Sequence, residues 1–159
     1  MKLHRTMMIL IALLGGVAGT GARADEAAVE EMAAYFDFVD YGGGVIFADQ
    51  IGAGDLEKFL VIDTRDAGQF AQDHLPGAIH IEWRQLLSRR AEIPKDKPVL
   101  VYCNTGSLSA QAGFAMRVAG WENVLILQGG LAAWRARHGA APEDDVPEAA
   151  DASAPTQPE

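Results

Sequence analysis

The sequence predicts an α/β fold, with a mainly parallel five-stranded sheet flanked by helices on both faces. Short apolar runs of strand length alternate along the chain with segments whose apolar residues recur every three or four positions, which is the helical period. Two of the runs, residues 99–102 and 124–127, are apolar without interruption, as in strands covered on both faces. Strands that alternate with helices form parallel sheets with helices packed on their faces.

The individual elements follow in chain order. Apolar residues at spacings of three and four between Glu26 and Val39 predict a lead-in helix, which Gly42-Gly43-Gly44 ends. Strands are expected at residues 45–47, 58–63, 78–81, 99–102 and 124–127. Helices are expected at residues 66–73, 82–90, 109–119 and 131–138. The proline and glycine at 76–77 and the glycine at 120 supply a turn and a helix end.

The two ends of the chain differ in composition from its middle. Lys2 and Arg5 precede an apolar run at 7–17, and small residues at 22 and 24 follow, which is the pattern of a secretory signal peptide. We expect cleavage after Ala24, a periplasmic or secreted protein, and no stable membrane insertion, because the run is shorter than the roughly 20 residues that span a bilayer.

This reading divides the chain into four parts. Residues 1–24 are the signal peptide, 25–43 the lead-in helix and linker, and 44–138 one folded domain. Residues 139–159 are mostly Ala, Pro, Asp and Glu, and we expect them to form a disordered acidic tail.

The net charge excludes some classes of partner. The chain has 13 basic and 22 acidic residues, a formal charge of −9. Removing residues 1–24 takes away three basic residues (Lys2, Arg5 and Arg23) and no acidic one, so the remaining charge is 10 − 22 = −12. Such a chain repels nucleic acid and anionic lipid.

Cys103 is the only cysteine, so the chain cannot form an internal disulfide. It follows the apolar run 99–102 directly and precedes a short loop that contains Gly106 and leads into a helix. Ligand sites of parallel sheets gather at the carboxyl ends of the strands, and backbone N–H groups of such a loop can form an anion-binding nest. We therefore expect a reactive thiolate, the alternative being an inert buried thiol.

Three segments resemble signatures of the rhodanese superfamily. They are residues 60–81, with D-T-R, a phenylalanine and H-L-P-G-A-I-H-I; residues 99–109, with Y-C-N-T-G-S-L-S; and residues 124–134, ending L-Q-G-G-L-A-A-W. The resemblance implies a single rhodanese-like domain and a sulfurtransferase of the thiosulfate sulfurtransferase type. It further implies that Cys103 takes sulfane sulfur from thiosulfate or a persulfide or polysulfide donor, becomes a persulfide, and passes the sulfur to a thiophilic acceptor. The acceptor that the resemblance implies is commonly a thiol, with protein thiols among the candidates.

The loop after Cys103 supplies the expected substrate-binding residues. They are Asn104, Thr105, Gly106, Ser107, Leu108 and Ser109, whose N–H groups are expected to hold the persulfide anion. The alternative for the two serines is helix capping. Arg65 is a further substrate-binding candidate, although arginine is well suited to bracing a carboxylate such as that of Asp63. Sulfur transfer from a thiolate needs no general base, so His74 is expected to belong to a turn.

Neither a metal nor a cofactor is expected. The histidines at 4, 74, 80 and 138 do not form a metal-ligand spacing with the lone cysteine. The three tryptophans, at 83, 121 and 134, are expected to pack in the core.

The loop departs from many members of the superfamily at Asn104 and Leu108, where basic residues often occur. This favours weak activity on anionic thiosulfate, or a natural persulfide or polysulfide donor. It also leaves open a catalytically weak or inactive binding or regulatory module, although such members commonly lack the cysteine. A phosphatase or arsenate reductase of related fold is disfavoured, because its loop is one residue longer and ends in arginine.

Overall fold

The computed structural model describes residues 20–139 of the chain. The apolar run of the predicted signal peptide and nearly all of the predicted acidic tail lie outside these residues. Helix α1 (Thr20–Phe38) begins upstream of the predicted cleavage site after Ala24. Cleavage, export and a disordered tail therefore stay predictions.

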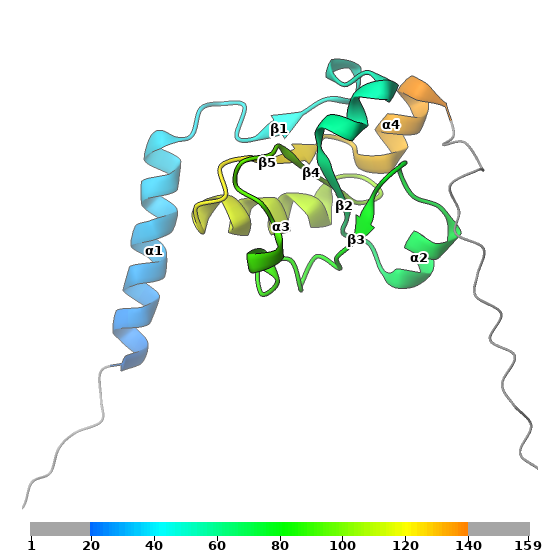
Figure 1. Cartoon of the computed structure of the whole chain (residues 1–159). Coiled ribbons are helices and arrows are strands. Elements are labelled where there is room, and N and C mark those ends of the chain that lie inside the picture. The colour runs from blue at the N-terminus through cyan, green and yellow to red at the C-terminus, as the bar shows by residue number, and fades with distance from the viewer. Residues whose placement is uncertain (1–19, 140–159) are drawn as a thin grey trace, which may run out of the picture.

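Five parallel strands form a single sheet, as the sequence predicts (Figure 1). They are β1 (Val45–Ile46), β2 (Leu60–Asp63), β3 (Ile79–His80), β4 (Val99–Tyr102) and β5 (Val124–Leu127), in the order β1-β5-β4-β2-β3. The two central strands of uninterrupted apolar residues have the predicted bounds. Both edge strands are shorter than predicted, because each pairs on one side only and over two residues.

The helices of the domain cover both faces of this sheet. They are α2 (Ala67–Gln72), α3 (Ser107–Val118) and α4 (Gly130–His138), with short 3-10 helices η1 (Ala48–Gln50), η2 (Ala53–Lys58) and η3 (Arg90–Glu92). Lys58 ends η2, so the prediction that it opens a strand is wrong. Helix α3 begins two residues before the predicted start, because Gly106 adopts a left-handed φ of 95° and serves as its N-cap.

The prediction of an α-helix over residues 82–90 is wrong. The segment consists of turns that run into η3, and most of its backbone hydrogen bonds join residues three positions apart, as from Gln85 to Glu82 and from Arg90 to Leu87. Leu86 is fully buried whereas Leu87 is 42% exposed. One buried anchor does not provide the continuous apolar stripe by which tertiary packing stabilises an α-helix.

The core consists of two layers separated by the sheet. Along β4, Val99 and Val101 face one layer and Leu100 and Tyr102 the other. The first layer packs beneath α3 and contains Ile62, Ile81, Leu86, Ile93, Val99, Val101, Ala112, Met116, Val124 and Ile126. The second packs beneath α4 and contains Ala48, Ile51, Leu56, Val61, Leu75, Leu100, Tyr102, Leu127, Leu131 and Trp134. Trp83 and Trp121 pack at the margin of the first layer, so all three tryptophans have the predicted packing role.

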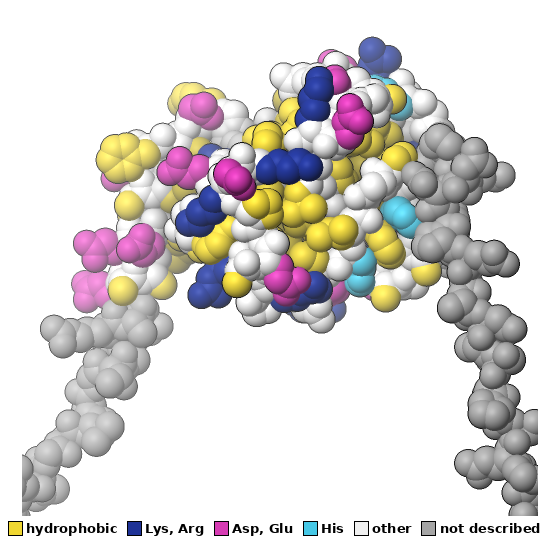
Figure 2. Space-filling model, in the orientation of Figure 1, with side chains coloured by type: hydrophobic (Ala, Val, Ile, Leu, Met, Phe, Trp, Pro, Cys, Tyr) yellow, Lys and Arg dark blue, Asp and Glu magenta, His cyan; other side chains and the backbone are white. Residues whose placement is uncertain are grey.

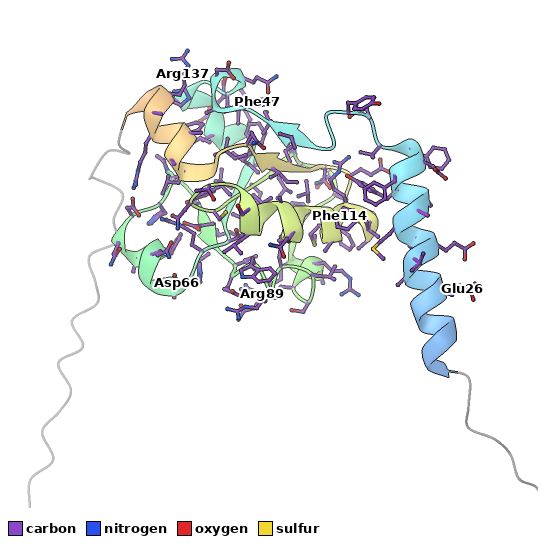
Figure 3. The ribbon with its side chains drawn as sticks, turned by 180° about the vertical axis from the view of Figure 1, so that it is seen from behind. Glu26, Phe47, Asp66, Arg89, Phe114 and Arg137 are labelled. Carbon is purple, nitrogen blue, oxygen red and sulfur yellow. The ribbon has the colours of Figure 1, made fainter. Side chains whose placement is uncertain are left out.

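Helix α1 stands at one side of the domain and extends beyond it (Figures 1 and 3). Its attachment is aromatic: the ring of Tyr35 meets Phe114 of α3 edge-on at 5.3 Å, and Phe36 stacks on Phe114 at 5.6 Å. Figure 2 shows acidic and apolar side chains exposed along α1. A groove of about 660 Å³ lies between α1 and the domain, and no residue of the Cys103 loop lines it. Within residues 20–139, no helix is both long and apolar enough to cross a membrane.

Candidate active site

Cys103 lies at the carboxyl end of β4, the middle strand of the sheet, where three chain segments meet. The N–H and Oγ1 of Thr64, just after β2, both donate to the carbonyl of Tyr102, at 2.9 and 2.8 Å. From the other side, Leu131 at the start of α4 donates its N–H to the carbonyl of Cys103, at 2.8 Å. The chain at Tyr102 and Cys103 is therefore anchored by the residue after β2 on one side and by the first turn of α4 on the other. Only 2% of Cys103 is exposed.

The loop from Cys103 to Ser109 curls its backbone N–H groups around the sulfur. The N–H of Gly106 donates to Sγ of Cys103 at 3.2 Å, and the hydroxyl of Ser109 lies 3.7 Å from Sγ. Burial raises the pKa of the Cys103 thiol, but the N–H and hydroxyl of Ser109 and the N–H groups of Thr105 and Leu108 outweigh it, so the pKa is lowered overall. This geometry is the predicted nest, and it favours a thiolate over an inert buried thiol.

The hydroxyl side chains of the loop divide into one that faces the sulfur and two that face solvent. Ser109 is fully buried and also donates its hydroxyl to the carbonyl of Gly106, at 3.1 Å. Thr105 and Ser107 are exposed, with their hydroxyl oxygens 3.3 Å apart. The capping alternative for the serines is wrong, because Gly106 is the N-cap of α3 and makes no side-chain cap. Leu108 is half-buried in the first turn.

The amide of Asn104 is held on the side of the loop that faces β2. Its Oδ1 accepts from Nη1 of Arg65 at 3.3 Å, and its Nδ2 donates to Oε1 of Gln69 at 2.7 Å. The side chain of Asn104 thus orients the loop from outside, while its neighbours in sequence supply the N–H groups that reach the sulfur.

Arg65 braces carboxylates, which is the role that the sequence favoured. Its Nη2 and Nε donate to Oδ2 of the buried Asp63, at 2.7 and 3.0 Å. The other donor, Nη1, contacts Oδ1 of Asp73 at 3.3 Å in addition to Asn104. The guanidinium is nearly inaccessible, with 4% of the side chain exposed, so the structure offers no support for Arg65 as a residue that binds substrate directly.

Asp73 is a residue of the site region that the sequence did not single out. It pairs with Arg65 and also with Arg135 of α4. Asp63 and Asp73 therefore pair with Arg65 and Arg135 and balance their positive charge.

His74 and Tyr102 are structural. Nδ1 of His74 contacts the carbonyl of Phe70 at 2.9 Å, and its ring stacks on Phe70 at 4.2 Å. The hydroxyl of Tyr102 accepts from the N–H of Leu75 at 2.9 Å. Both interactions hold the turn that follows α2. Among residues 20–139, no three His, Cys, Asp or Glu side chains come together in an arrangement able to hold a metal ion.

Helix α4 contributes to the site through its first turn, and sequence reasoning did not assign it a role there. The N–H groups of Leu131 and Ala132 donate to the carbonyls of Cys103 and Asn104, at 2.8 and 3.0 Å. The pair Gly129-Gly130, with φ values of 74° and 57°, brings the helix into this position. The adjacent glycines 129 and 130 are the sequence feature that could have indicated a close contact between α4 and the Cys103 loop.

Comparisons with known proteins agree with this geometry. Residues 46–137 match the model of the family described as rhodanese-like domain. A protein named sulfurtransferase from Allochromatium vinosum is 40% identical over 85 residues, which cover 54% of this chain and 78% of that protein. Thiosulfate sulfurtransferase GlpE from Coxiella burnetii is 32% identical over 79 residues, covering 50% of this chain and 74% of the enzyme.

A solved structure supports the same assignment. The solution structure of the rhodanese-like domain from the Anabaena protein Alr3790 superposes with a TM-score of 0.56 at 28% identity, covering 73% of this chain and 90% of that one. The parallel sheet, the cysteine loop and the family match together lead to one conclusion: this chain belongs to the rhodanese-like domain family and is a sulfurtransferase relative.

Proposed function

We propose that the protein transfers sulfane sulfur through a persulfide on Cys103. The observation that carries this proposal is the ring of N–H donors around Sγ, from Thr105, Gly106, Leu108 and Ser109. Such a nest stabilises the thiolate before the reaction and a persulfide anion after it, with no charged side chain in contact. No other side chain in the chain offers a thiol, because Cys103 is the only cysteine.

The reaction consists of two displacements at sulfur. In the first, the Cys103 thiolate attacks the sulfane sulfur of the donor; a new S–S bond forms, the donor's own bond to that sulfur breaks, and the leaving group, sulfite when the donor is thiosulfate, departs with the electron pair. In the second, a thiolate or cyanide attacks the outer sulfur and Cys103 leaves as thiolate. The two steps need no net proton transfer, consistent with a site in which His74 is engaged by the carbonyl of Phe70.

The charge around the loop supports a persulfide or polysulfide as the natural donor. Arg65 and Arg135 are paired with Asp63 and Asp73, and the loop itself is uncharged from Asn104 to Ser109. A dianion such as thiosulfate therefore meets only backbone dipoles on a protein of net negative charge. We propose thiosulfate as a poor donor, and a periplasmic or secreted location for the reaction.

The decisive experiment is intact-mass spectrometry of the purified protein after exposure to thiosulfate or to a low-molecular-mass persulfide. We expect one added sulfur atom on the parent and none on Cys103→Ser, followed by release of that sulfur to cyanide. Absence of the added atom with both donors would overturn the proposal and favour a binding or regulatory module that retains the fold.

A further inference from the structure

The first turn of α4 lies against the outside of the sulfur-binding loop. The N–H of Leu131 donates to the carbonyl of Cys103 at 2.8 Å, and the N–H of Ala132 to the carbonyl of Asn104 at 3.0 Å. These N–H groups belong to the first turn, where a helix has no partners of its own to offer them. We infer that Gly130 is a positioning residue, because it lets this turn hold the loop with its N–H groups directed at the sulfur.

The planarity of the peptide bond explains how a contact outside the loop acts on its inside. In a trans peptide, the C=O of one residue and the N–H of the next point in opposite directions. When Ala132 holds the carbonyl of Asn104 outward, the N–H of Thr105 must point inward. The N–H of Thr105 is one of the donors that lower the pKa of Cys103. The helix therefore sets the direction of a donor that lies 27 residues earlier in the chain, since 132 − 105 = 27.

Only glycine permits this approach at position 130. A Cβ added there would lie 2.2 Å from the carbonyl oxygen of Cys103 and 2.8 Å from the backbone N of Gly106. Both of these atoms are backbone, so a side chain at 130 displaces the loop itself rather than a flexible neighbour. Gly106 is also closely packed, because its own added Cβ would lie 3.3 Å from the N of Gly129 and from the carbonyl of Leu127.

The chain offers a control for Gly130→Ala that separates positioning from backbone strain. Gly77 has a φ of 69°, against 57° for Gly130, and a Cβ at Gly77 would meet nothing within 4 Å. Both substitutions place alanine in the left-handed region, at a comparable cost of strain. Only Gly130→Ala pushes on the sulfur loop.

The test is a pH titration of Cys103 in the full chain, in which the rate of alkylation by iodoacetamide reports the thiolate. It is carried out at a temperature where circular dichroism shows that each variant is folded. We expect Gly130→Ala to move the alkylation midpoint to higher pH and to lower the thiolate population below that midpoint about tenfold, the effect of one charge-assisted hydrogen bond. Gly77→Ala should leave the midpoint unchanged. Equal midpoints for Gly130→Ala and the parent would overturn the inference.

A second variant applies if Gly130→Ala does not fold. Ala132→Pro removes the N–H that holds Asn104, and costs no hydrogen bond within α4 because proline is tolerated in the first helical turn. An unchanged midpoint in this variant overturns the inference, and a midpoint at higher pH supports it. This inference rests on the proposed function only in taking the sulfur of Cys103 as the reactive one. If the parent carries no persulfide but the midpoint still moves, the proposed function fails and this inference stands.

Discussion

Replacing Ser109 with alanine tests whether side-chain as well as backbone donors hold the reactive sulfur. Ser109 is fully buried, and its hydroxyl oxygen lies 3.7 Å from Sγ of Cys103 and 3.1 Å from the carbonyl of Gly106. Ser109→Ala removes a donor that faces the thiolate, so the pKa of Cys103 must rise. The carbonyl of Gly106 keeps a partner, because it also accepts the N–H of Ala110 at 2.8 Å. The substitution therefore leaves no buried acceptor without a donor.

The expected magnitude follows from this geometry. A hydrogen bond to a charged group contributes about 1.5–3 kcal/mol when well formed. The 3.7 Å separation between oxygen and sulfur is long, so we assign about 1 kcal/mol to it, which corresponds to a roughly fivefold smaller thiolate population below the midpoint. The cost in unfolding free energy should be of the same order, since the substitution removes one buried hydroxyl and leaves no buried polar group without a partner.

The thiolate can be titrated through its ultraviolet absorbance, with Cys103→Ser as the blank, because the chain has no second cysteine. Ser107→Ala is the matched control: it lies in the same loop, but its hydroxyl is exposed and contacts Thr105. We expect the midpoint to rise for Ser109→Ala and to stay constant for Ser107→Ala. Equal midpoints for Ser109→Ala and the parent would show that the backbone N–H groups alone hold the sulfur.

Three further predictions follow from the charge of the site and of the chain. Leu108→Arg should raise kcat/KM for thiosulfate about five- to tenfold at low salt, because about 1 kcal/mol of attraction between the guanidinium and the dianion remains after desolvation and screening. The kcat/KM for a neutral persulfide donor should not change. A gain that salt does not reduce would contradict the electrostatic argument. A second prediction concerns stability, because the pKa of Cys103 is lowered in the folded protein. Between that pKa and the unfolded value near 8.5, the unfolded state binds more protons than the folded state, so the free energy of unfolding should rise with pH by at most about 1.4 kcal/mol per pH unit. This gain in stability is lost as the pH falls through the folded pKa. Urea unfolding across this pH range measures the effect, and Cys103→Ala should lack it; parallel curves for the two proteins would refute the linkage. Finally, mass analysis of the protein exported by a bacterial host should find Asp25 at the N-terminus, and an intact Met1 on membrane-associated protein would show that residues 1–24 are retained.

Much of the fold was predictable because its signals are local. The runs 99–102 and 124–127 are apolar throughout, which is typical of strands that are covered on both faces. The structure gives β4 and β5 the predicted bounds. The edge strands and residues 82–90 were less predictable, because their state depends on how many partners the tertiary structure provides.

The sequence by itself also determined the position of the candidate nucleophile and of the loop that surrounds it. Cys103 directly follows a buried strand, and the N–H groups that surround its sulfur come from the next six residues, so their arrangement depends on one turn of the chain. Only the tertiary structure decided which groups orient that turn. Arg65 contacts Asp63, Asp73 and Asn104, and the first turn of α4 bonds the loop from outside, next to Gly130. Most of these contacts join residues that are far apart along the chain. A local sequence pattern does not indicate which of several possible partners will come within hydrogen-bond distance when the chain packs.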